Sequence, residues 1–164
     1  MAKREVRMWP DPVLTQICAP VDVNAPDVAA LIEDLFDTMY DAKGRGLAAP
    51  QIGVLQRMFV VDVTWKEGPP EPRVFINPEV ASTSDAASEM SEQCLSIPDL
   101  PMSVTRPDHI QLRWSTRAGD RLEARFDGIL ARCILHEFDH LNGKVIFDHQ
   151  PAPLRADLEA RYAP

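Results

Sequence analysis

The sequence predicts an α+β fold in a single domain that spans residues 1–164. Helices and strands are grouped along the chain rather than strictly alternating, and this segregation is typical of α+β proteins. One helix is predicted in the first third of the chain and another near the C-terminal end, with β-strands between them. The length is sufficient to bury a substantial core, and an apolar content of 45% is typical of globular proteins.

The first predicted helix covers residues 27–42. Its apolar side chains recur at helical spacing and form one stripe, which consists of Val28, Leu31, Ile32, Leu35, Phe36 and Met39. We expect Glu33, Asp34 and Asp37 to face away from this stripe. The helix is therefore predicted to be scaffold that packs against the core.

The expected strands lie between the two main helices and cover residues 57–63, 74–76, 109–115 and 121–126. Asn77-Pro78 is expected to end the second strand, and residues 118–120 are expected to join the last two strands as a hairpin. Residues 81–89 are small and polar, which predicts a loop or an edge strand. A short polar helix is expected over residues 153–162.

A His-Glu-x-x-His motif near the C-terminal end is the strongest signal for chemistry. Asp127 lies at the expected N-cap of its helix, and Gly143 lies where the helix should end. His136 and His140 are four residues apart, so their rings project from one helical face and can bind one metal ion. Glu137 lies beside that face and can reach a water on the metal without being a ligand. The alternative is a chance pair of surface histidines, which the surrounding apolar helix disfavours.

The three cysteines are Cys18, Cys94 and Cys133, an odd number at wide spacing that is not a disulfide framework. Most free cysteines are buried small hydrophobes, and we expect this of Cys18 and Cys133. The histidine pair lacks an obvious third ligand, so we favour metal ligation for Cys94. Two imidazoles and a thiolate leave a fourth position open for water, which is the arrangement of a catalytic site.

The segment 44–53 is rich in small residues and can let a ligand approach the backbone closely. Gln51 is its one neutral polar side chain able to donate a hydrogen bond. Taken alone, the segment is more typical of an ordinary turn, because a Gly-rich loop is weak evidence.

Composition and charge exclude several classes of protein. The formal net charge is −8, from 17 basic and 25 acidic residues, which disfavours direct nucleic-acid binding. No apolar run approaches the roughly 20 residues of a membrane span, and no apolar signal core follows the charged N-terminus. We therefore expect a cytoplasmic location.

Three segments together resemble the signature motifs of bacterial peptide deformylases: Gly-x-Gly-Leu-Ala-Ala-x-Gln-x-Gly from Gly44, Glu-x-Cys-Leu-Ser from Glu92, and His-Glu-x-Asp-His-Leu from His136. The resemblance extends to Trp9-Pro10-Asp11-Pro12, to Ile76-Asn77-Pro78 and to Arg106-Pro107, and it covers nearly the whole chain.

The resemblance implies antiparallel sheets packed around the central helix that carries the metal histidines. It implies a metal-dependent hydrolase that removes the N-formyl group from the N-terminal methionine of nascent proteins and releases formate. The implied cofactor is one divalent ion, most often Fe²⁺, with Zn²⁺, Ni²⁺ or Co²⁺ as possible occupants. The implied partner is an N-formyl-methionyl peptide or nascent chain, without direct nucleic-acid or membrane binding, and we expect a monomer.

Matched to this sequence, the family's motifs assign roles to individual residues. The implied metal ligands are Cys94, His136 and His140, and the implied general base and acid is Glu137. The implied oxyanion donors are the Gln51 side chain and the Leu95 backbone amide. The implied substrate-binding residues are Gly46, Arg45, Ile129 and Cys133, and Glu92 is expected to pair with Arg106 beneath the cysteine.

The chain departs from the family pattern at three positions. Gln93 replaces a glycine, Leu135 replaces a glutamine, and Arg45 replaces an aliphatic residue of the methionine pocket. Arg45 could narrow that pocket or point outward. Two alternatives to an active deformylase therefore stay open: a hydrolase that acts on another N-acyl amine or peptide, and a catalytically poor metal-binding protein. The intact Glu137 favours an enzyme.

Overall fold

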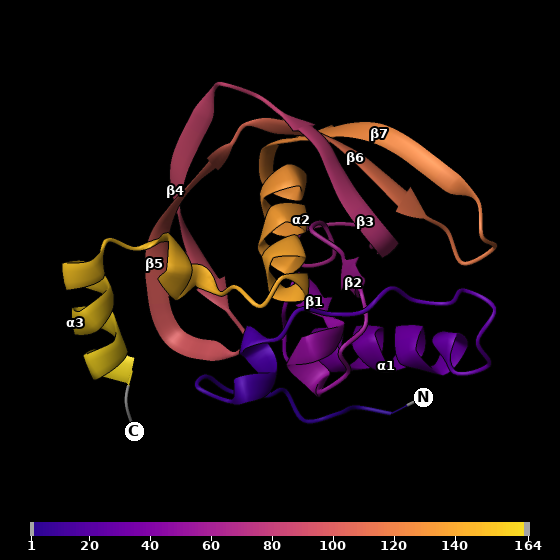
Figure 1. Cartoon of the computed structure of the whole chain (residues 1–164), viewed down its shortest axis with the longest axis horizontal. Helices are drawn as coiled ribbons and strands as arrows, with labels where there is room; N and C mark the ends of the chain where they lie inside the picture. Colours follow the sequence, from indigo (N-terminus) through magenta and orange to yellow (C-terminus); the bar gives the residue numbers. More distant parts are fainter. Residues whose placement is uncertain (1, 163–164) are drawn as a thin grey trace.

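Two antiparallel sheets surround one helix in the structure, a computed structural model that describes residues 2–162 (Figure 1). The larger sheet has the strand order β1-β2-β3-β6-β7, and the smaller sheet is the β4-β5 hairpin. The strands are β1 (Gly46–Ala48), β2 (Met58–Val61), β3 (Arg73–Thr83), β4 (Ala87–Cys94), β5 (Ile97–Pro107), β6 (His109–Ser115) and β7 (Arg121–Asp127). All of them pair antiparallel with their neighbours.

Helix α2 (Gly128–Leu141) lies between the two sheets and carries the His-Glu-x-x-His motif (Figure 1). Ala131, Ile134 and Leu135 on α2 join a buried cluster with side chains of the larger sheet. Packing on the larger sheet therefore holds α2 in place while its histidines are presented to the end of β4. Asp127 is the N-cap residue, although its side chain makes no capping hydrogen bond.

Helix α1 (Val28–Asp41) confirms the first predicted helix and packs its apolar stripe against β1 and β2. The expectation for Asp34 is wrong, because this carboxylate is buried rather than outward-facing. It accepts hydrogen bonds from the backbone amide of Ala2 and from Arg4 Nε, both at 2.8 Å. The N-terminal segment thus covers a charged position on α1, which helical periodicity alone could not reveal.

Helix α3 (Ala152–Tyr162) lies against β5 at the edge of the molecule, as the polar composition of the predicted C-terminal helix indicated (Figure 1). The described residues also contain three short 3₁₀ helices: η1 (Pro12–Thr15), η2 (Ala49–Ile52) and η3 (Ile146–His149). No helix within residues 2–162 has the length and apolarity that a membrane crossing requires.

The predicted β6–β7 hairpin is confirmed, but the expected end of the second strand is wrong. Asn77-Pro78 does not end a strand, because β3 continues to Thr83 through a register shift between Ile76 and Glu79. Residues 81–89, expected to be a loop or an edge strand, comprise the end of β3, a short connection at residues 84–86 and the start of β4, an edge strand of the two-stranded sheet. Strand β4 buries only Glu92 and Cys94 along its length, so no apolar alternation marks it in the sequence.

Candidate metal centre and active site

Cys94, His136 and His140 converge at one point inside the protein. Each offers one ligand atom, and these atoms all lie within 4.8 Å of one another. The Cys94 Sγ atom is 3.4 Å from His140 Nε2. The three residues are 4%, 8% and 1% exposed, respectively. Two imidazoles from one helical face and a sulfur from the end of β4 therefore form a donor set that could hold a divalent ion.

The turn between β4 and β5 places the cysteine. Cys94 pairs with Ile97 across this turn, and the backbone amide of Trp9 donates to the carbonyl of Ser96 at 2.9 Å. A register shift between Glu92 and Cys94 interrupts the hairpin just before the turn. The turn is thus fixed both by its own hairpin and by the N-terminal segment.

Glu92 contacts the candidate ligand His136 and two arginines. Its Oε1 atom lies 2.9 Å from His136 Nδ1 and 2.9 Å from Arg106 Nη2. Its Oε2 atom accepts from Arg106 Nε and from Arg132 Nη1, both at 2.6 Å. Burial raises the pKa of Glu92, but His136 and Arg106 outweigh burial and lower it well below its usual range. With Nδ1 engaged by a carboxylate, His136 presents its Nε2 to the metal centre.

Asp139 extends this network to the far side of Arg106. Its Oδ2 atom accepts from Arg106 Nη1 at 3.0 Å and lies 2.7 Å from His149 Nε2. Arg106 and His149 are therefore the two partners of Asp139. His149, which lies in η3 and belongs to none of the motifs, was not identified from the sequence.

Arg132 was also missed as a member of the network. It lies four residues before His136, on the same face of α2, and that spacing could have indicated it. Besides Glu92, its guanidinium donates to the carbonyls of Val104 and Ser88 at 2.9 and 2.7 Å. Arg132 thereby joins α2 to both strands of the hairpin.

Glu137 is buried directly beside Gly46. Its Oε1 atom has no hydrogen-bond partner among the described residues. A Cβ atom at Gly46 would lie 2.6 Å from Glu137 Oε2 and 2.9 Å from Cys133 Sγ, so only glycine fits there without displacement. Burial raises the pKa of the Glu137 carboxyl. A raised pKa suits a group that must both take up and release a proton near neutral pH.

Gln51 is oriented by the backbone and points its amide nitrogen at the cysteine. Its Oε1 atom accepts from the Ala48 backbone amide at 2.9 Å. Its Nε2 atom lies 3.0 Å from Ser96 Oγ and 3.7 Å from Cys94 Sγ. The segment 44–53 is therefore more than an ordinary turn, because it forms β1 and η2 and directs a donor into the site.

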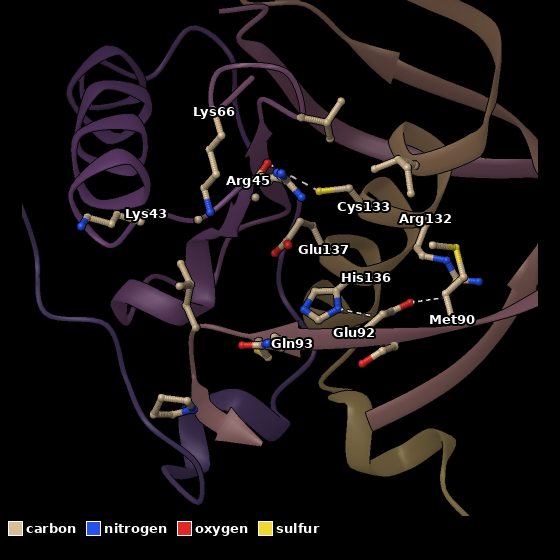
Figure 2. Close-up of a pocket in the computed structure, with 18 of the residues that line it drawn as sticks. Lys43, Arg45, Lys66, Met90, Glu92, Gln93, Arg132, Cys133, His136 and Glu137 are labelled. Atoms are coloured by element: carbon tan, nitrogen blue, oxygen red, sulfur yellow. Dashed lines mark hydrogen bonds and ion pairs between the residues drawn. The ribbon is translucent and has the colours of Figure 1, made fainter. Parts of the chain in front are cut away.

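A cavity of about 570 Å³ opens beside the metal centre (Figure 2). The predicted site residues that line it are Arg45, Gly46, Gln51, Cys94, Leu95, Ile129, Cys133, His136 and Glu137, whereas His140 is not a lining residue. Cys133 also packs against the core, as expected from the sequence, and its Sγ atom is 3.5 Å from the Arg45 carbonyl.

The three departures from the family pattern occupy different environments. Gln93 is exposed, lines the cavity and is not among the described residues with positive φ, so no strain accompanies the lost glycine. Leu135 is a residue of α2, and its side chain is buried in the core cluster that α2 forms with the larger sheet. Arg45 lines the cavity while its guanidinium pairs with Glu67 at the surface.

The profile of the polypeptide deformylase family matches residues 3–155. This chain belongs to the polypeptide deformylase family. A peptide deformylase of Cellvibrio japonicus is 41% identical over 166 residues, covering 99% of this chain and 97% of the relative. One of Rhizobium meliloti is 46% identical over 161 residues, covering 98% and 92%. The crystal structure of a peptide deformylase from Legionella pneumophila superposes with a TM-score of 0.90 at 38% identity, covering 98% of this chain and 94% of that chain.

Membership of the deformylase family confirms the predicted resemblance, the α+β fold class and the enzyme class, a metal-dependent amide hydrolase. Gly46, Gln51, Cys94, Leu95, His136, Glu137 and His140 lie in the three segments that resemble the signature motifs of the family. Their individual roles stay predictions.

Proposed function

We propose that this chain removes the formyl group from N-terminal methionine with one divalent ion held by Cys94, His136 and His140. The observation that carries the proposal is the convergence of these three buried donors beside the Glu137 carboxylate. Family membership supports the reaction, and the cavity beside the donors has room for a peptide end.

The side chains present fit a metal ion. Burial raises the pKa of the Cys94 thiol, but the two neighbouring histidines outweigh burial and lower it well below its usual range, so the sulfur is available as a thiolate. Glu92 orients His136, as expected for a ligand histidine. The buried Glu137 Oε1 atom without a protein partner is suited to a water in the cavity. A divalent ion bound here would lower the pKa of a water and polarise the formyl carbonyl.

The residues of the chain would then divide the proton transfers and the charge stabilisation. Glu137 takes a proton from the attacking water, whose oxygen bonds to the formyl carbon. The Gln51 Nε2 group and the Leu95 backbone amide donate to the oxyanion that develops. Glu137 returns the proton to the nitrogen as the carbon–nitrogen bond breaks, releasing formate and a free amine.

We also propose that the site takes Fe²⁺ in the cell, and that Zn²⁺, Ni²⁺ or Co²⁺ can replace it. The Gly46 backbone would hold the substrate peptide, with Arg45, Ile129 and Cys133 around its first side chain. The remaining proposals are a single domain over residues 1–164, a monomer in the cytoplasm, and no direct binding of nucleic acid.

The test is formate release from a formyl-methionyl peptide by protein loaded with iron under anaerobic conditions. The wild type should turn the peptide over, whereas Glu137→Ala should bind metal and release little formate. An acetyl-methionyl peptide in a parallel reaction tests for another N-acyl substrate. Stoichiometric metal without release of either acyl group would refute the proposal and favour a protein that only binds metal.

Direct metal analysis tests the ligand assignment separately. Cys94→Ser should lower the bound metal per chain, while Cys18→Ser, at a buried cysteine outside the cluster of three donors, should leave the metal content unchanged. Equal metal content in both variants would refute ligation by Cys94.

A further inference from the structure

Lys66 and Arg45 place positive charge on the wall of the active-site cavity. Both residues line the cavity that also contains Glu137. Figure 2 shows the Lys66 side chain extending from its loop toward the part of the cavity that holds Arg45 and Glu137, whereas the ammonium group of Lys43 points away. The chain as a whole carries a net charge of −8, so this local positive charge runs against its average.

The loop that carries Lys66 is held firmly in place. Three backbone amides, including that of Trp65, donate to Asp62 Oδ1 at 3.2 Å. Tyr40 donates to the other oxygen of Asp62 at 2.6 Å. The Trp65 indole nitrogen donates to the Gly44 carbonyl at 2.9 Å, at the start of the segment that carries Arg45. The two cations are therefore positioned by one connected piece of structure.

The two cations are available to a ligand to different degrees. Lys66 Nζ lies 5.6 Å from the centre of the Trp65 ring and has no ion-pair partner among residues 2–162. Arg45 pairs with Glu67, which is exposed, and such surface pairs are weak enough to be exchanged for a ligand.

Of the other charged residues that line the cavity, Lys43 and Asp99 are exposed, whereas Arg132 and Glu92 are engaged inside the protein. Arg132 donates to Glu92 and to two carbonyls, so it contributes no free donor. Glu92 is neutralised by Arg132 and Arg106. At the wall beside Glu137, Lys66 thus has no ion-pair partner among residues 2–162, and Arg45 has the exposed Glu67 as its ion-pair partner.

We propose that Lys66 and Arg45 form a carboxylate-binding wall that selects formylated peptides with a carboxylate close behind the formylated residue. The carboxylate can be an Asp or Glu side chain or the free C-terminus of a short peptide, since both present the same group to a lysine and an arginine. This inference rests on the proposed function, because it concerns the choice among substrates of that reaction.

The test compares three formyl tripeptides that differ in one carboxylate. They are formyl-Met-Glu-Ser amide, formyl-Met-Gln-Ser amide, and formyl-Met-Gln-Ser with a free C-terminus. We expect kcat/KM for at least one of the two acidic peptides to exceed that of the neutral amide by about fivefold. Which acidic peptide is preferred distinguishes the side chain from the terminus. This preference should weaken in 0.5 M salt, because Lys66 and Arg45 are both exposed and salt screens exposed charges.

Adjacent substitutions should move this preference in opposite directions. Lys66→Gln should bring the acidic-to-neutral ratio close to one, and Lys66→Glu should favour a formyl-Met-Lys-Ser amide instead. Glu67→Gln should raise the ratio, because it frees Arg45 from a competing carboxylate. Lys144→Gln removes the same charge from an exposed position that does not line the cavity, and it should keep the wild-type ratio.

The outcomes separate this inference from the proposed function. Equal rates on all three peptides in the wild type, or an unchanged ratio in Lys66→Gln, would overturn the carboxylate-binding wall while leaving the deformylase reaction intact. No formate from any of the three peptides would instead overturn the proposed function, and the carboxylate-binding wall with it.

Discussion

Gly46→Ala gives the sharpest test of how Glu137 is positioned. The added Cβ would lie 2.6 Å from Glu137 Oε2, whereas ordinary contact begins at 3.4 Å, so the carboxylate would have to retreat by about 0.8 Å (3.4 − 2.6). Displacing a reacting group by about 1 Å can cost about 10²-fold in rate. We therefore expect kcat/KM to fall about 10²-fold, equivalent to about 2.7 kcal/mol of transition-state stabilisation.

The assay is formate release by metal-loaded protein, with metal content and thermal stability measured on the same samples. Overpacking at Gly46 should cost about 1–3 kcal/mol of stability, so the comparison belongs well below the unfolding temperature. Gly68→Ala is the matched control, because its nearest neighbour would be 4.0 Å away and its activity should not change. A Gly46→Ala enzyme with full metal and a kcat/KM within threefold of wild type would refute the proposed role of the Glu137 position.

Three further predictions concern the surroundings of the site and the N-terminus. Glu92→Gln should remove the negative charge that balances the buried Arg106, which lowers the free energy of unfolding by about 3 kcal/mol and Tm by about 10 °C. It should also weaken metal binding at least tenfold in a competition titration, because Glu92 orients His136. An unchanged Tm would contradict the prediction. Leu135→Gln introduces the residue that the family motif has at this position, and it should lower the free energy of unfolding by about 2 kcal/mol because a buried amide would lack hydrogen-bond partners. Denaturant unfolding measures this loss, and an unchanged free energy of unfolding would contradict the prediction. The Ala2 backbone amide and Arg4 lower the pKa of Asp34 from 3.8 to about 2, so their stabilisation is present above about pH 4 and is lost as the pH falls toward 2. As the pH falls through this window, the Tm of the wild type should approach the Tm of Asp34→Asn. A Tm difference between the two proteins that stays constant at all pH values would exclude the linkage.

Much of the fold and of the candidate site could be predicted from local patterns. The spacing of His136 and His140 on an apolar helix is a local property, and so is the stripe on α1. Strand β4 was expected only as part of a loop or an edge strand, because its buried positions are Glu92 and Cys94 rather than apolar residues. A strand that buries functional groups lacks the alternation by which strands are found. Strand β5 was missed although it buries Met102, Val104 and Arg106 at alternate positions.

The supporting network was predicted only in part for a different reason. The pair between Glu92 and Arg106 followed from the resemblance to the family, and the contact is present at 2.6 Å. Arg132 on α2 lies 40 residues from its partner Glu92, and His149 in η3 lies 10 residues from its partner Asp139. These contacts depend on how the elements pack, and helical spacing indicates only that Arg132 shares a face of α2 with His136.

The sequence by itself determined the elements that bring their own chemistry: a helix with two histidines one turn apart, a cysteine in a short motif, and a run of small residues. These depend on propensity, spacing and residue type over a few positions. Only the tertiary structure decided that Gly46 lets β1 approach Glu137, that Asp34 is covered by the N-terminus, and that Lys66 faces the cavity. Each of these is a distance between segments far apart along the chain, and such distances are set by the packing of the whole molecule.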